Sequence, residues 1–117
     1  MNNYKKINTL NEPRRELHDE LGLTGAEVSI NNLPAGTKVP FVHAHKNNEE
    51  IYLILDGSGY AIIDGEEVKL TKGDCLRISP SAKRQLAASN HEKITYACIQ
   101  VRKNSLQGYT ADDAIIF

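Results

Sequence analysis

From Gly25 onward, short apolar runs alternate with turn residues, and this feature constrains the fold of the chain most strongly. Clusters of Gly, Pro, Asp and Ser bound the runs at the spacing typical of β-sandwiches and β-barrels. No long stretch with a period of 3.6 residues follows residue 25. The pattern predicts strands at Ala26–Asn31, Phe41–His45, Ile51–Leu55, Gly59–Ile63, Glu67–Leu70, Asp74–Ile78, Arg84–Ala88 and Ile94–Val101.

The clearest turn is Asp64-Gly65, which lies between two strand-like runs. An Asp-Gly pair tolerates the positive φ angles of a tight two-residue hairpin. About eight short antiparallel strands in so small a chain would expose long edges unless the sheet folded over or closed. We therefore predict an all-β domain, either a barrel or a two-sheet sandwich.

Residues 1–24 differ from the rest because they are polar and lack this alternation. Their few leucines fit a short helix or a short strand, and Pro13 would interrupt either one. We predict that residues 1–24 form an N-terminal arm that packs on a single β domain at 25–117.

Composition excludes several classes of partner. The 14 basic and 15 acidic residues give a net charge of −1, which offers no attraction to nucleic acid or to an anionic membrane. No apolar run approaches the roughly 18 residues of a membrane span, and the first 25 residues lack the apolar segment of a secretory signal. We expect a cytoplasmic protein in which Cys75 and Cys98, both inside apolar runs, are buried free thiols.

Two of the four histidines, His43 and His45, lie two residues apart. On a strand they would project from the same face. Glu50 begins the next strand-like run after a short polar turn, so a hairpin could return its carboxylate to the two imidazoles. Two imidazoles and a carboxylate suit a divalent ion such as zinc, iron, nickel or manganese.

Two alternatives stay open at this point. Strand alternation places Glu50 with Tyr52 and Glu49 with Ile51, and both faces of this run are apolar, so periodicity does not choose between the two glutamates. A His-x-His pair followed by a polar turn also fits two surface histidines with no metal.

Two segments resemble the conserved motifs of the cupin superfamily. Residues 36–57 (GTKVPFVHAHKNNEEIYLILDG) carry a glycine, a spacer, His-x-His, a glutamate and a second glycine in the order of the first motif. Residues 73–90 (GDCLRISPSAKRQLAASN) are similar to the second motif. Six residues separate Glu50 from Gly57, as in the family, so the resemblance selects Glu50 over Glu49. It covers about residues 26–101, most of the chain.

The resemblance implies a cupin-type antiparallel β-barrel, a jelly-roll-like double-stranded β-helix, that holds one divalent metal ion on His43, His45 and Glu50. Zinc is the first expectation, with iron, nickel or manganese as alternatives. Where many cupins have a fourth ligand, a histidine, this chain has Gln85. Gln85 would be a weak ligand, a partner of a metal-bound water, or a pocket residue that never touches the metal.

Several neighbours on the strands would share the inner wall with this cluster, although buried tyrosine rings and solvated arginine heads are also ordinary features of such proteins. The predicted pocket residues are Tyr52, Tyr60, Arg77, Arg84, Tyr96 and Cys98.

The predicted function is that of a metal-binding cupin with a small-molecule pocket and unassigned chemistry. One alternative is a metal-dependent dioxygenase, isomerase or lyase that acts on a small oxygenated substrate. Another is a non-catalytic ligand-binding or sensing module, and a third is a metal-free relic of the fold. The expected partners are a small molecule and a second copy of the chain, since cupins of this kind often dimerise by sheet extension.

Overall fold

A computed structural model describes residues 3–108 and 112–117 of the chain. The described part is almost entirely strand, which confirms the all-β prediction, and it contains no helix long and apolar enough to cross a bilayer. Its elements are β1 (Arg14–Glu16), α1 (His18–Leu21), β2 (Glu27–Leu33), β3 (Asn48–Ile63), β4 (Glu66–Thr71), β5 (Cys75–Ile78), β6 (Arg84–Ala88) and β7 (Ile94–Arg102).

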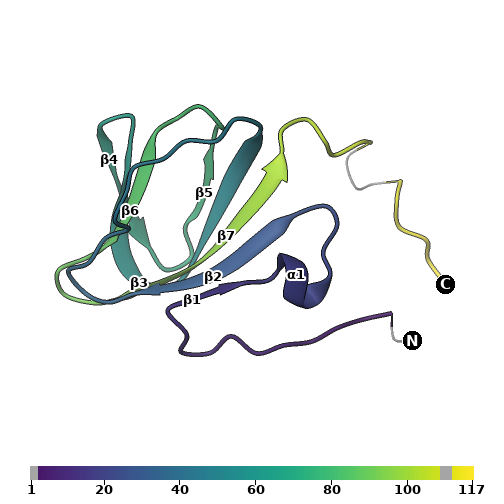
Figure 1. Cartoon of the computed structure of the whole chain (residues 1–117), viewed down its shortest axis with the longest axis horizontal. Helices are drawn as coiled ribbons and strands as arrows, with labels where there is room; N and C mark the ends of the chain where they lie inside the picture. The colour runs from purple at the N-terminus through teal and green to yellow at the C-terminus, as the bar shows by residue number, and fades with distance from the viewer. Residues whose placement is uncertain (1–2, 109–111) are drawn as a thin grey trace.

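The strands are antiparallel and fold over on themselves into two facing sheets (Figure 1). We call the sheet formed by β1, β2, β7, β5 and the first half of β3 sheet A. Sheet B contains the second half of β3 with β4 and β6. Among the described strands, the path of pairing does not close on itself, so the predicted double-sheet cupin-type fold is present as an open sheet.

Strand β3 runs through both sheets without a break, whereas the sequence predicts two strands there. The chain bends where the register with β7 shifts between Ile54 and Asp56. Two glycines permit the bend because a Cβ atom at Gly57 would lie 1.8 Å from the Lys93 carbonyl oxygen, and one at Gly59 would lie 2.1 Å from that of Ala87. The Asp-Gly-Ser-Gly segment, interpreted from sequence as a turn, is therefore the crossing between the sheets.

Other strand predictions have mixed outcomes. Strand β6 has the predicted bounds, and the hairpin between β3 and β4 turns at Asp64 and Gly65 with φ angles of 49° and 84°. The predicted strand at 41–45 is wrong. This segment makes only isolated bridges, including one between His43 and Arg84, because it crosses the end of β6 and does not run along a partner strand.

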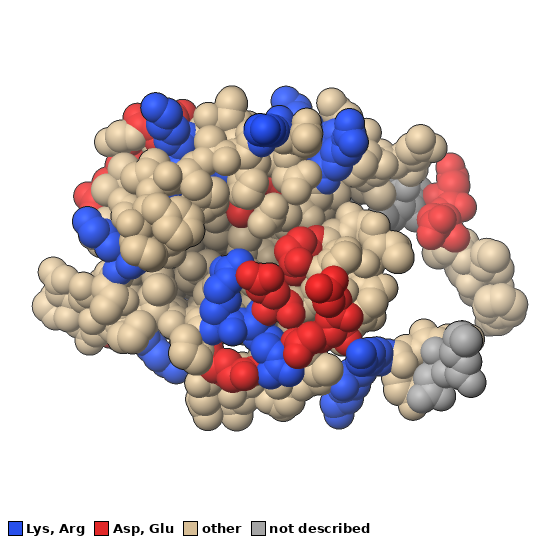
Figure 2. Space-filling view, in the orientation of Figure 1, with Lys and Arg blue, Asp and Glu red and all other residues tan. Residues whose placement is uncertain are grey.

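The N-terminal segment contributes one short strand and one short helix. Strand β1 pairs with the outer edge of β2, and α1 follows it directly. Acidic and basic side chains gather side by side over β1 and α1 (Figure 2). Salt bridges there join Arg15 to Glu12 and Glu20. Both bridges are partly exposed, so we assign them orientation of the segment and little stability.

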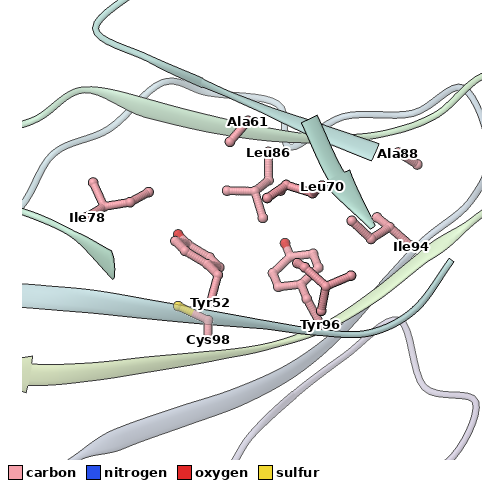
Figure 3. Packing of buried hydrophobic residues seen from close by; sticks show 10 residues of the cluster. Tyr52, Ala61, Leu70, Ile78, Leu86, Ala88, Ile94, Tyr96 and Cys98 are labelled. Atoms are coloured by element: carbon pink, nitrogen blue, oxygen red, sulfur yellow. The ribbon is translucent and has the colours of Figure 1, made fainter. Parts of the chain in front are cut away.

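The core lies between the two sheets. Tyr52 and Tyr96 project from sheet A toward Leu86 and Leu70 of sheet B (Figure 3). Cys98 is buried beside them, as predicted. The prediction for Cys75 is wrong, because Cys75 pairs with Leu53 on the outer side of sheet A and is exposed.

Candidate metal centre

His43, His45 and Glu50 converge at one end of the space between the sheets. Each offers a ligand atom, and these atoms lie within 4.8 Å of one another. The Nε2 atom of His45 lies 3.2 Å from Glu50 Oε2, and that of His43 lies 3.7 Å from Oε1. The sequence-based expectation that the three groups share a centre therefore matches their placement.

The two histidines belong to an irregular segment that is tied to neighbouring strands by its backbone. His43 exchanges backbone hydrogen bonds with Arg84 in both directions, and the His45 amide donates to the Pro80 carbonyl. These bonds fix the alternation of side chains locally, so both imidazoles point the same way although no regular strand forms.

Glu50 sits on β3 and is almost fully buried, at 2% exposure. Its Oε1 accepts hydrogen bonds from the Tyr52 hydroxyl at 2.9 Å and from Arg84 Nη1 at 3.0 Å. Its Oε2 accepts one from the Cys98 thiol at 3.1 Å. Burial of a carboxylate is costly unless it is paired and hydrogen-bonded, and this one is both.

The pKa values of the centre follow from these contacts. Burial alone would raise the pKa of Glu50, but the hydrogen bonds from Cys98 and Tyr52 and the charges of His45 and Arg84 outweigh it, so the pKa is lowered. Burial lowers the pKa of His43. Burial and the charge of Glu50 raise the pKa of Cys98 to about 12. The centre therefore holds an ionised carboxylate, a neutral His43 imidazole and a protonated thiol near neutral pH.

Arg84, and not Gln85, reaches into the centre. Arg84 is fully buried on β6, and its guanidinium also donates to the Ser79 carbonyl. Gln85 is the next residue on the strand and faces the other way, where its amide nitrogen donates to the Val39 carbonyl at 2.7 Å. This placement corrects the prediction of Gln85 as a fourth ligand, because adjacent residues on a strand project to opposite faces.

Strand alternation also corrects two of the predicted pocket residues. Tyr60 pairs with Lys69 and Ala87 on the outer face of sheet B, since its neighbour Ala61 is the one that faces the core. Arg77 pairs with Ile51 on the outer face of sheet A and is exposed. Neither side chain lines the cavity beside the centre.

A cavity of about 470 Å³ opens beside the cluster. The predicted pocket residues Tyr52, Tyr96 and Cys98 are in its wall, together with His43 and Glu50. The sequence interpretation missed the part of the wall supplied by β1 and β2, including Arg14 and Asn31. The alternation of Glu27, Ser29 and Asn31 along β2 was the available signal, because a polar face on a buried strand requires partners.

The donor set fits a divalent metal ion. Two ring nitrogens, His43 Nδ1 and His45 Nε2, are buried and have no hydrogen-bond partner. Buried polar atoms without partners are costly, and an imidazole nitrogen in this state is ready to coordinate. Two neutral imidazoles and one ionised carboxylate form the facial set found in several metal sites. Arg84 adds a positive charge beside this set that a metal ion would have to share.

Comparisons with known proteins agree with this geometry. The family model described as "Cupin domain" matches residues 30–99. A crystal structure of a cupin protein from Bacteroides fragilis is 56% identical, covers 100% of this chain and 99% of its own, and superposes with a TM-score of 0.96. A Cupin 2 conserved barrel domain protein from Salinispora arenicola is 17% identical, with 86% and 92% of the two chains covered and a TM-score of 0.72.

One curated relative, an uncharacterized protein from Methanocaldococcus jannaschii, is 32% identical over 66 residues, which are 56% of this chain. The match spans about half (52%) of the length of that relative. The family match covers more than half of the chain and includes both motifs as well as the three converging side chains. This chain is therefore a member of the cupin family.

Proposed function

We propose that this cupin binds one divalent metal ion on His43, His45 and Glu50 and uses it to hold a small molecule in the adjacent cavity. The observation that carries the proposal is the pair of buried, unpartnered imidazole nitrogens beside an ionised carboxylate. Zinc is the first candidate, and iron, nickel and manganese accept the same ligands. When bound, such an ion supplies a Lewis acid that polarises an oxygen atom of the ligand.

Binding is better supported than proton-transfer catalysis. The two groups nearest to Glu50, Tyr52 and Cys98, both donate their protons to it. Burial raises the pKa of Tyr52 and that of Cys98, so neither releases its proton near neutral pH. Both residues therefore serve to orient Glu50, which leaves the cavity wall short of a group that could accept a proton.

Elemental analysis of protein purified without chelator tests the proposal. We expect about one equivalent of metal per chain. His43→Ala and Glu50→Gln should each reduce the content at least about tenfold. His91→Ala is the matched control because His91 is exposed and lies outside the motif. Equal metal content in wild type, His43→Ala and His91→Ala would contradict the assignment.

We also propose that the protein acts as a homodimer. The radius of gyration, 15.6 Å, exceeds the value of about 13 Å for a compact chain of this length. Apolar side chains at the C-terminal end, Ile115, Ile116 and Phe117, are strongly exposed, and a second copy would shield them. Light scattering during size-exclusion chromatography should give twice the chain mass of 13.0 kDa. A mass of one chain at micromolar concentration would contradict the dimer.

A further inference from the structure

A chain of polar contacts leads from the interior of β2 to the rim of the cavity. Ser29 and Asn31 are buried, at 2% and 3% exposure. The Asn31 amide donates to the Ser29 hydroxyl at 3.0 Å, and Arg14 Nη1 donates to Asn31 Oδ1 at 2.7 Å. Arg14 and Asn31 face each other directly across β1 and β2.

Burial of two polar side chains costs free energy that an apolar pair at the same positions would not. In return, the buried amide fixes one arm of the Arg14 guanidinium at the cavity wall. The arrangement is therefore a support that orients a cation toward the cavity, as an apolar β2 could not.

The guanidinium of Arg14 retains binding capacity. Its Nε donates to Glu16 at 3.3 Å, and both side chains of this pair are more than half exposed, at 53% and 64%, so the pair is weak. Its Nη2 has no hydrogen-bond partner among residues 3–108 and 112–117. An arginine with a free N–H edge matches the two oxygens of a carboxylate.

The rest of the wall is apolar. The cavity surface beyond Arg14 and the metal cluster is formed mainly by Leu33, Val39, Pro40, Phe41, Leu86 and Tyr96. A ligand that fills this space must present apolar surface to it, because sugars and other polyhydroxylated molecules would lose hydrogen bonds to water without replacement.

We infer that Arg14 is a specificity-determining residue and that the cavity takes a small monocarboxylate with an apolar body. The carboxylate pairs with Arg14, and the other end of the ligand faces His43, His45 and Glu50. A phosphate dianion fits less well, because Glu16 lies beside the single arginine and would repel the second charge. The inference rests on the proposed function for the position of the cavity beside a metal, and it adds the class of ligand.

Calorimetric titration with 4-phenylbutanoate and its uncharged analogue 4-phenylbutanamide tests the inference. Wild type should bind the carboxylate about tenfold more tightly than the amide, as expected for one charge-assisted hydrogen-bonded pair. Arg14→Gln should abolish this preference. Glu16→Gln, which removes the competing carboxylate, should strengthen binding of 4-phenylbutanoate about threefold.

Arg15→Gln is the matched control, because Arg15 is adjacent on β1 but faces the opposite side, where it pairs with Glu12 and Glu20. It should leave both affinities unchanged. Equal binding of the two probes by wild type, an undiminished preference in Arg14→Gln, or the absence of binding of either probe would overturn the inference. Tighter binding of phenyl phosphate than of 4-phenylbutanoate would overturn the assignment to monocarboxylates.

The titrations are run on zinc-loaded and on chelator-treated protein, with metal content measured for each variant. A preference that disappears with chelator but persists in Arg14→Gln places the carboxylate on the metal and overturns the inference while the proposed function holds. A wild type that binds no metal but keeps an Arg14-dependent preference supports the inference and refutes the metal-dependent function.

Discussion

The two halves of the metal centre are built in opposite ways. Glu50 lies in the middle of a sheet, nearly inaccessible to water, with Tyr52, Arg84 and Cys98 donating to it. His43 and His45 lie on an irregular segment, with side chains 31% and 22% exposed. We call these the wall and the loop.

The comparison shows how a site can be ordered before a metal arrives. The wall satisfies its own charge through Arg84, so it needs no ion in order to fold. The loop leaves two ring nitrogens without partners and so has the larger gain from coordination. Metal binding should therefore change the loop and leave the wall nearly unaltered.

The largest expected effect is loss of the buried charge pair in the wall. Arg84→Met should reduce the free energy of unfolding of the metal-free protein by about 3–5 kcal/mol, because it leaves Glu50 buried and without its counter-charge. Urea denaturation followed by circular dichroism measures this loss. The double variant Arg84→Met/Glu50→Gln should recover most of it, and failure to recover would show that Arg84 acts through its shape and not through its charge.

Thiol reactivity tests whether the wall is closed. Cys98 is buried with its pKa raised to about 12, whereas Cys75 is exposed on the outer side of sheet A. Iodoacetamide should therefore alkylate Cys75 about 100-fold faster than Cys98 at pH 8, as mass spectrometry of peptides would show. Comparable rates at the two sites would mean that β7 opens readily and that the wall is no more rigid than the loop.

Proteolysis reports on the loop. Lys46 is exposed in the segment that joins His45 to β3, so trypsin should cleave there when the loop opens. Zinc at saturating concentration should slow this cleavage about tenfold through preferential binding to the closed state. Cleavage after Lys103, in the turn beyond β7, is the internal control and should not change. Equal protection at both lysines would point to global stabilisation.

The smallest effect should come from a histidine of the loop in the absence of metal. His45→Ala should change the free energy of unfolding of chelator-treated protein by less than about 1 kcal/mol, since the side chain is partly exposed and its Nε2 makes no hydrogen bond. Thermal unfolding with chelator measures it. A loss as large as that of Arg84→Met would remove the distinction between wall and loop.

Local patterns in the sequence predicted the wall better than the loop. The bounds of β6 and the turn at Asp64-Gly65 follow from apolar alternation and from the tolerance of Asp-Gly for positive φ. The segment at 41–45 has the same alternation but no partner strand along its length. Periodicity records which side chains face inward and cannot supply the partner that makes a strand.

The error at Gln85 has a different origin. Its role as a ligand came from the motif resemblance, whereas the alternation of β6 places Arg84 and Leu86 on the inner face. Charge at a buried strand position was a signal in the sequence, since Arg84 falls between apolar neighbours that face the core. Its pairing with Glu50 depends on how β3 and β6 cross in space, which no spacing along the chain specifies.

The continuity of β3 has a mechanical consequence. One uninterrupted strand carries Glu50 at one end and supplies the backbone partners of β4 and β6 at the other. Neither sheet can detach while the other persists, so their amide protons should exchange with deuterium at a common, slow rate set by global opening. A ligand that tightens its hold on Glu50 would thus be felt by the far hairpin as a longer lifetime of every hydrogen bond along the strand.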